Sequence, residues 1–237
     1  MRDFRFAPLA ALLVLFSLAG CGGGDKSTKP VVPPSDGLPA GTPAADSPAH
    51  LAQRLEATWE NKGEAEYAKL LSDDFRYHFS LSSDPVLVDQ YGDNWKRTNE
   101  VTALTHLFHG FTNTQGTVVP ATSRIDMTLN GVSVVTDMDH PDSTAQYQKM
   151  VVTVLEMQVE VPSGYEPISY SISSRQELYL VRGDAAVLPA GAVATTTRWY
   201  VRRWEDLSSA GTGARKGPVI NPASPATLGR LKSTFYL

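Results

Sequence analysis

The chain has 237 residues, of which 42% are hydrophobic, and its 21 Lys and Arg residues against 25 Asp and Glu residues give a formal net charge of −4. A mildly acidic chain is a poor candidate for binding nucleic acid, so we expect no nucleic-acid partner. The single cysteine, Cys21, excludes a disulfide within the chain, and the folded part must rely on its hydrophobic core.

The first twenty residues have the pattern of an export signal. Arg2 and Arg5 form a basic start, and the apolar stretch at 7–18 is shorter than the about 20 residues that span a bilayer. Small residues then precede Cys21 in the tetrapeptide LAGC at 18–21. This tetrapeptide resembles, at every position, the lipobox of bacterial lipoproteins.

The resemblance implies that residues 1–20 are a signal peptide cleaved before Cys21, whose sulfur then carries a diacylglycerol. Two or more acyl chains make membrane anchoring stable, whereas one holds a protein only reversibly. In this class of signals, Gly22 in place of an aspartate favours the outer membrane. We therefore predict an exported protein, lipid-anchored to the bacterial cell envelope at the outer membrane. The alternative is an unmodified thiol after an ordinary secretory signal.

Residues 21–46 are rich in glycine, proline and serine and contain almost no large apolar side chains. Such a segment buries too little surface to offset its ordering entropy, so we predict a disordered tether. The periodic part that follows, residues 47–207, is long enough for one hydrophobic core. The remaining tail, residues 208–237, is low in complexity until a short helix is indicated near 225–232.

The predicted domain opens with helices. Ser47 followed by Pro48 is a typical helix start, and the apolar residues Leu51, Leu55 and Trp59 recur on one stripe. A second short helix is predicted over 64–71. A third is predicted over about 99–111, with its apolar arc formed by the following residues: Val101, Leu104, Phe108 and Phe111.

Alternation of apolar and polar residues predicts strands in the rest of the domain. The strands are expected around 75–79, 125–129, 155–161, 168–181 and 196–204. Helices followed by long strands with one apolar face indicate an α+β fold, with two or three N-terminal helices packed on one side of an antiparallel sheet.

The order of these elements resembles the nuclear transport factor 2-like, or SnoaL-like, superfamily over residues 47–207. The residues that carry the resemblance are Trp59 in the first helix, Asp73-Asp74-Phe75 entering the first strand, and Trp199 and Trp204 in the last strand. The resemblance implies a curved sheet wrapped around a long helix, with a cone-shaped pocket inside. The superfamily contains isomerases and hydrolases as well as members that only bind ligands or partners, so the fold does not decide the function.

The apolar faces of the predicted helices and strands give the candidate residues of such a pocket. The residues expected to line it are the following: Trp59, Tyr67, Phe75, Tyr77, Phe79, Tyr170, Gln176 and Trp199. Alternation along the predicted strands directs their ionisable side chains outward, namely His78, Arg124, Asp126, Glu156 and Glu160. Catalysis of the isomerase type needs a carboxylate or histidine inside the cone, so we assign no catalytic residue. A single β-bulge would reverse this alternation beyond it.

Two further patterns suggest metals but fit poorly. His106 and His109 lie one helical turn apart, but they project away from the apolar arc and have no acidic partner nearby in the sequence, which favours two solvated side chains. The acidic stretch 136–142 lacks the glycine and the final glutamate of a calcium-binding loop. We expect neither a metal nor a cofactor.

Three functions remain open. The first is a non-catalytic module that binds a small apolar ligand in an aromatic cone, or a protein partner through its sheet. The second is a small-molecule isomerase or hydrolase of the SnoaL-like type. The third is a structural homodimer joined through the outer face of the sheet.

Overall fold

The computed structural model describes residues 37–162, 168–183, 188, 194–209 and 227–236. The chain divides into two units, Met1–Pro34 and Ser35–Leu237, and every described element belongs to the second. The predicted signal peptide, Cys21 and most of the predicted tether lie outside the described residues. Within the part that is described, no helix has both the length and the apolar character needed to cross a membrane.

Helix α1 (Pro48–Glu60) begins where its sequence signals place it. The Ser47 hydroxyl accepts a hydrogen bond from the backbone N–H of His50 at 3.2 Å, which satisfies one of the free donors at the helix start. Leu51, Leu55 and Trp59 are fully buried on one face. The short helix α2 (Glu64–Ala68) follows directly and buries Tyr67.

Two more helices precede the main run of strands. Helix α4 (Arg97–His109) is the predicted third helix, and its buried stripe consists of Glu100, Ala103, Leu104, Leu107 and Phe108. Helix α3 (Pro85–Tyr91), which ends in the short 3₁₀ turn η1 (Gly92–Asn94), was not predicted from the sequence. The helix has only 7 residues, and its apolar side chains Leu87, Val88 and Tyr91 are only partly buried against the core, so the apolar stripe is too short to reveal it.

The main sheet has the strand order β1-β8-β7-β6-β4, and a further short strand, β5 (Ser133–Val135), pairs with β6. The long strands are β6 (Tyr147–Val161), β7 (Ile168–Gly183) and β8 (Thr195–Asp206), and they pair antiparallel, as does β4 (Arg124–Asn130) with β6. The first strand, β1 (Leu71–His78), pairs with β8 in parallel. A separate small hairpin joins β2 (Phe111–Thr112) to β3 (Val118–Val119).

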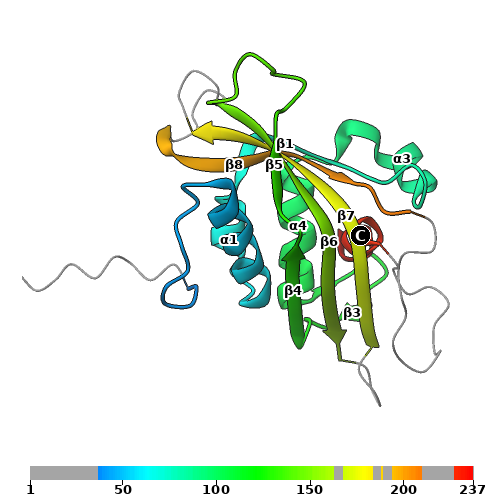
Figure 1. Cartoon of the computed structure of the whole chain (residues 1–237). Helices are drawn as coiled ribbons and strands as arrows, with labels where there is room; N and C mark the ends of the chain where they lie inside the picture. Colours follow the sequence, from blue (N-terminus) through cyan, green and yellow to red (C-terminus); the bar gives the residue numbers. More distant parts are fainter. Residues whose placement is uncertain (1–36, 163–167, 184–187, 189–193, 210–226, 237) are drawn as a thin grey trace, which may run out of the picture. The chain divides into compact units, whose positions relative to one another are not determined.

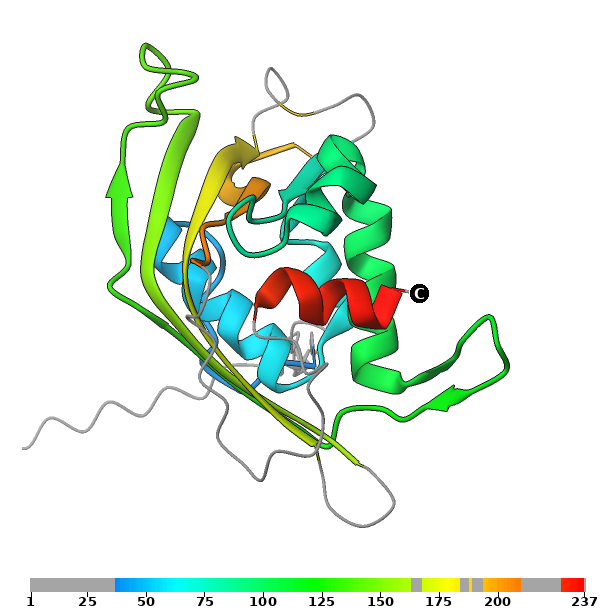
Figure 2. The same cartoon turned by 90° about the vertical axis from the view of Figure 1, so that its right-hand side faces the viewer.

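The sheet is curved, and the helices lie against its concave face (Figures 1 and 2). This arrangement confirms the predicted α+β class with a curved, mainly antiparallel sheet. The predicted inward residues of two strands are buried, namely Phe75, Tyr77, Ile125, Met127 and Leu129. Their polar neighbours Arg124 and Asp126 face solvent and pair with each other at 2.7 Å.

Strand β4 lies at one edge of the sheet, and its free backbone N–H groups are hydrogen-bonded by side chains of α1 rather than by another strand. The backbone N–H of Met127 donates to the Glu60 carboxylate at 3.3 Å, and that of Leu129 donates to the Glu56 carboxylate. Burial raises the pKa of Glu56 above its ordinary value. These carboxylates satisfy backbone donors that a further strand would otherwise pair with, which blunts this edge of the sheet.

Candidate functional site

The last helix of the chain, α5 (Leu228–Tyr236), lies on the concave side of the sheet among the other helices (Figure 2). We call the space between the concave face of the sheet and helices α1, α3 and α4 the cone. Leu228, Leu231 and Phe235 of α5 lie in the cone, where all three are buried and belong to the hydrophobic core. A helix is therefore present in the C-terminal tail, and it packs its apolar face into the core while Arg230 and Thr234 on its other face are exposed.

A buried carboxylate on α4, Glu100, receives three polar contacts inside the cone. Its Oε1 accepts a hydrogen bond from the Tyr67 hydroxyl at 2.6 Å and forms an ion pair with Lys232 Nζ of α5 at 2.7 Å. Its Oε2 accepts from the indole N–H of Trp95 at 2.8 Å. Because Glu100 has no exposed surface, these contacts replace the water that would otherwise stabilise its charge.

The ammonium of Lys232 lies between that carboxylate and two aromatic rings. Its Nζ is 3.8 Å from the ring centroid of Tyr77 and 4.2 Å from that of Trp204. Both distances are within the range of cation–π attraction. Burial lowers the pKa of Lys232 below its ordinary value, and the nearby Glu100 opposes that shift.

A second buried carboxylate, Asp206 at the end of β8, holds the start of α5. Its Oδ2 accepts from the Tyr77 hydroxyl and from the backbone N–H of Gly229, each at 3.1 Å. Its Oδ1 accepts from the Gln176 side chain at 2.9 Å, and Gln176 in turn accepts from the Trp204 indole at 2.6 Å. Burial raises the pKa of Tyr77 well above its ordinary value, and the charge of Asp206 adds to that effect.

A third buried carboxylate, Asp84, contacts the same end of α5. It comes from the loop between β1 and α3, which is not part of the sheet. Its Oδ2 accepts from the Thr227 hydroxyl at 2.6 Å, and its Oδ1 pairs with Arg230 Nε at 2.6 Å. Glu100, Asp206 and Asp84 come from a helix, a strand end and a loop, and each contacts α5 or the residue just before it. The helix is thus bound through charge as well as through its apolar face.

The eight predicted pocket-lining residues fall into three groups. Tyr67, Tyr77, Phe79 and Gln176 gather around α5, either in direct contact with it or one hydrogen bond away. Trp59 and Phe75 are fully buried in the core beside them. Trp199, whose backbone N–H donates to Ala45 at 2.7 Å, and the partly buried Tyr170 belong to other parts of the sheet.

Sequence reasoning missed the three carboxylates, Trp95 and Lys232. A signal was available for Glu100, which shares the helical stripe of Leu104 and Leu107, and for Lys232, which lies between Leu231 and Phe235 on the stripe of α5. In both cases a charged residue occupies an apolar stripe, which is the pattern of a buried polar contact.

Asp206 was missed for a different reason. In the first part of β8 the buried residues have odd numbers, such as Trp199 and Val201. Further along the strand the buried residues have even numbers, namely Trp204 and Asp206. The register with β7 shifts at this point, because Leu178 pairs with Trp204 and Leu180 pairs with Val201. An extra residue in one strand has this effect on every side chain beyond it.

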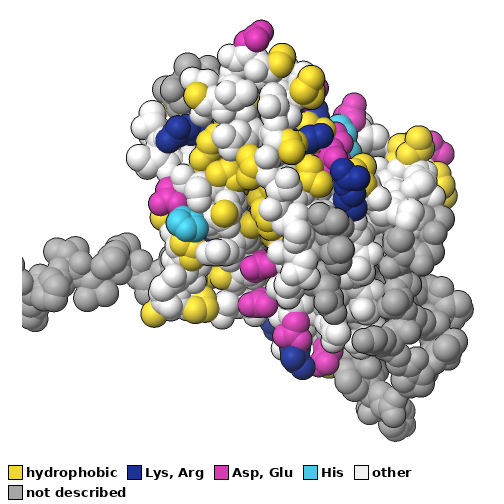
Figure 3. Space-filling view, viewed as in Figure 1, with side chains coloured by type: hydrophobic (Ala, Val, Ile, Leu, Met, Phe, Trp, Pro, Cys, Tyr) yellow, Lys and Arg dark blue, Asp and Glu magenta, His cyan; other side chains and the backbone are white. Residues whose placement is uncertain are grey.

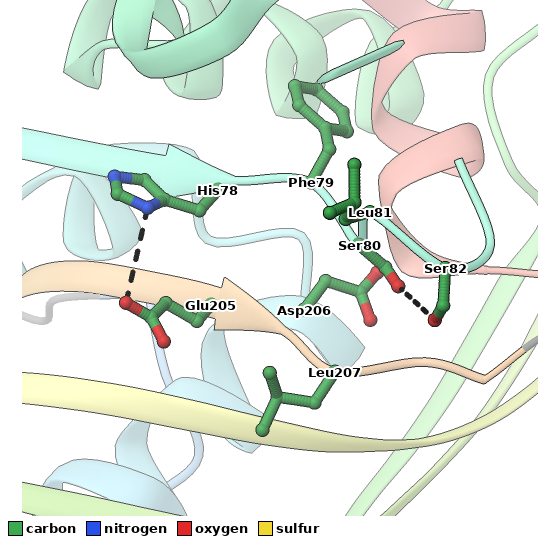
Figure 4. Close-up of a pocket in the computed structure, with 8 residues that line it drawn as sticks. All are labelled: His78, Phe79, Ser80, Leu81, Ser82, Glu205, Asp206 and Leu207. Carbon is green, nitrogen blue, oxygen red and sulfur yellow. Dashed lines mark hydrogen bonds and ion pairs between the residues drawn. The ribbon is translucent and has the colours of Figure 1, made fainter. Parts of the chain in front are cut away.

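A surface cavity of about 610 Å³ opens where β1 and β8 end (Figure 4). Because the two strands are parallel, their carboxyl ends meet at one edge, and the residues lining the cavity are the following: His78, Phe79, Ser80, Leu81, Ser82, Glu205, Asp206 and Leu207. His78 lies between two carboxylates, 3.5 Å from Asp93 and 4.0 Å from Glu205. Its side chain is partly exposed at this cavity, whereas the neighbouring Tyr77 is fully buried, which is the alternation that the sequence predicted.

The two histidines considered as metal ligands have separate partners. His106 stacks on Phe111 with centroids 4.2 Å apart, and its Nδ1 is 2.7 Å from the Phe235 carbonyl oxygen, so it is not the solvated side chain that was expected. His109 lies 3.4 Å from Glu64. Among the described residues, no three His, Cys, Asp or Glu side chains come together in a way that could hold a metal ion.

Figure 3 shows the molecule from the same side as Figure 1, with apolar side chains exposed over the upper and central part of this face and acidic side chains at its top, at its sides and along its lower centre. The exposed large apolar residues include Val132, Val134 and Val135, which lie in and beside the edge strand β5, and Met138 just after it. An exposed edge strand of apolar residues is a surface on which another chain can add a strand. The homodimer hypothesis stays a prediction.

Solved structures similar to this chain include NTF2-like proteins. An NTF2-like protein of unknown function in nutrient uptake from Rhodospirillum rubrum is 12% identical with a TM-score of 0.38, over 68% of this chain and 96% of that one. A protein called Rd1NTF2_04 with long sheet is 11% identical with a TM-score of 0.33, over 68% and 99%. A single-residue variant of a function-unknown protein from Mycobacterium tuberculosis is 10% identical with a TM-score of 0.39, over 79% and 83%. No family model and no curated protein matches the chain.

Proposed function

We propose that this protein is an exported lipoprotein, anchored through Cys21, whose folded domain is a non-catalytic binding module. The support for the anchor is the lipobox-like LAGC at 18–21 after a basic start and a short apolar stretch. Acyl chains on Cys21 would then hold the domain at the outer membrane. A Cys21→Ser variant is expected to move from the membrane fraction to the soluble fraction, and continued membrane association would refute the anchor.

The observation that carries the binding function is the way the cone holds α5. An amphipathic segment far along the chain fills the interior, and three buried carboxylates contact its first turns and its lysine. The same concave, aromatic surface is suited to a small, largely apolar ligand with a few fixed polar groups. On this proposal, α5 occupies the ligand site in the structure described here, and a ligand binds by displacing it.

Native mass spectrometry of the mature chain, starting at residue 21 and carrying Cys21→Ser, tests the proposal. A small molecule that co-purifies reproducibly with the chain is the expected result, and its mass would give the ligand class. A chain that is ligand-free in every preparation and gains no adduct from added apolar compounds would refute the binding function. The same spectrum gives the number of subunits and so tests the homodimer.

One observation favours the enzyme as a second candidate. His78 lies at a cavity with carboxylates on both sides, Asp93 at 3.5 Å and Glu205 at 4.0 Å, an arrangement that suits a general base. An isomerase or hydrolase activity at this cavity would be lost in a His78→Gln variant that folds normally. An activity that survives this substitution would exclude the cavity as its site.

A further inference from the structure

We propose that the ligand of the cone is a primary ammonium group on an apolar stem, and that Lys232 of α5 occupies its site as an internal ligand. This inference rests on the proposed binding function and specifies the chemical class of the ligand. It follows from the immediate surroundings of Lys232 Nζ, which combine one carboxylate with the faces of two aromatic rings.

The groups around Lys232 Nζ are also held by hydrogen bonds that do not involve Lys232. Glu100 is oriented by the Tyr67 hydroxyl at 2.6 Å and the Trp95 indole at 2.8 Å, both of which are fully buried donors on other elements. The Tyr77 hydroxyl is likewise held by Asp206 at 3.1 Å. A carboxylate beside aromatic faces is the arrangement that recognises organic cations in proteins, because each ring presents its negative face to the ammonium.

The charge of Glu100 sets the selectivity of the site. With Lys232 withdrawn, the carboxylate would remain buried beside two neutral donors, and an unpaired buried charge is strongly destabilising. A neutral apolar ligand would fill the volume but leave this charge uncompensated. A ligand carrying an ammonium would restore the ion pair as well as the apolar contact.

The rest of α5 indicates what accompanies the ammonium. The ammonium of Lys232 is carried on a stem of four carbon atoms. The neighbouring side chains of α5 that fill the cone are all apolar and buried, namely Leu228, Leu231 and Phe235. A ligand that replaces them must offer a comparable apolar body. The structure therefore points to an amphiphilic amine rather than to a small hydrophilic cation, whose hydration the apolar walls would not replace.

Hydrogen exchange of α5 in the presence of matched probes tests the inference. The mature chain with Cys21→Ser is incubated with n-octylammonium chloride or with 1-octanol, which share the same alkyl stem, each below the concentration at which it aggregates. Octylammonium is expected to increase amide exchange in residues 228–236 at a concentration at least tenfold lower than octanol, while exchange in β6 and β7 is unchanged. The matched control is the double variant Glu100→Gln/Lys232→Met, which keeps the volume and removes both charges. In this variant the advantage of octylammonium should vanish.

Because α5 is tethered and competes with any ligand, the same titrations are repeated in a Lys232→Ala variant, which opens the ammonium site without removing the helix. An advantage of octylammonium that disappears when Glu100→Gln is added supports the inference. Equal effects of the two probes in both chains would overturn the ammonium inference and leave an apolar binding site in place. No effect of either probe in either chain would overturn the binding function as well, since α5 would then be a permanent part of the core. Should Lys232→Ala fail to fold, the unmodified Lys232 chain and its neutral double variant decide the matter.

Discussion

The packing of α5 in the cone can be tested at a single glycine. Gly229 lies in the first turn of α5, and a Cβ added there would be 2.8 Å from a ring carbon of Phe79 and 3.3 Å from Asp84 Oδ2. The Phe79 ring has little room to retreat, because the rings of Tyr91 and Trp95 pack against it with centroids 5.4 and 5.2 Å away. Overpacking of this kind costs about 1–3 kcal/mol, and the better helix propensity of alanine returns about 1 kcal/mol. Gly229→Ala should therefore lower the free energy of unfolding by about 1 kcal/mol.

Thermal unfolding of the mature chain measures this effect. A loss of about 1 kcal/mol lowers the Tm of a domain of this size by about 2–4 °C. Two controls separate the effect of the steric clash with Phe79 from the effect of the higher helix propensity of alanine. Thr234→Ala, on the exposed side of α5, should leave the Tm unchanged or raise it slightly, and Gly229→Ala made together with Phe79→Leu should lose most of its penalty. If Gly229→Ala alone is as stable as the parent chain or more stable, α5 does not pack against Phe79 and the description of the filled cone is wrong.

Two further predictions concern pH. Burial raises the pKa of Glu66, but hydrogen bonds from Lys69 and Arg54 more than offset this and hold it below its ordinary value of 4.5. The free energy that the Glu66 carboxylate contributes to folding is therefore fully present above pH 4.5 and is lost as the pH falls. When the free energy of unfolding is measured with urea, Glu66→Gln should make its decrease at acid pH shallower. Burial also raises the pKa of both Tyr67 and Tyr77 well above the ordinary value of 10.0, so the unfolded chain loses these protons first and stability falls as the pH rises beyond it. Tyr77→Phe should make this decline shallower by about 1.4 kcal/mol per pH unit, and an unchanged slope between about pH 10 and 11.5 would contradict the assignment.

Local signals in the sequence were sufficient for most of the fold. Ser47 before Pro48 gave the start of α1, because a capping hydroxyl and a proline act on the backbone within one turn. The alternation in β1 and β4 gave the buried side of each strand, because successive side chains of a strand point to opposite faces. Both features depend only on residues close together in the chain.

The features that escaped prediction depend on distant residues or on the absence of a pattern. The parallel pairing of β1 with β8 joins the two ends of the domain, and nothing in either strand alone specifies its partner. The register shift in β8 moved Asp206 to the inner face, and a bulge leaves no mark in an alternating stretch until the partner strand is known. Helix α3 has only 7 residues, and its partly buried apolar side chains Leu87, Val88 and Tyr91 make a stripe too short for periodicity to reveal it.

The ion pair between Glu100 and Lys232 escaped prediction because it joins residues that are distant in the chain, and its place in the cone indicates what such a buried pair contributes to the fold. Each residue alone is a charge in an apolar stripe, and only the fold brings the two within 2.7 Å. A buried ion pair contributes little net stability, since the desolvation of both charges offsets most of their attraction, and a pair of apolar residues would often be as stable. Asp206 and Asp84 hold the first turn of α5, and the carboxylate of Glu100 fixes the position of the Lys232 ammonium in the next turn, so the three together allow one register of the helix in the cone. The pair therefore contributes chiefly to specificity, and a site that admits one register of its own helix is by the same physics a site that distinguishes a cationic ligand from a neutral one.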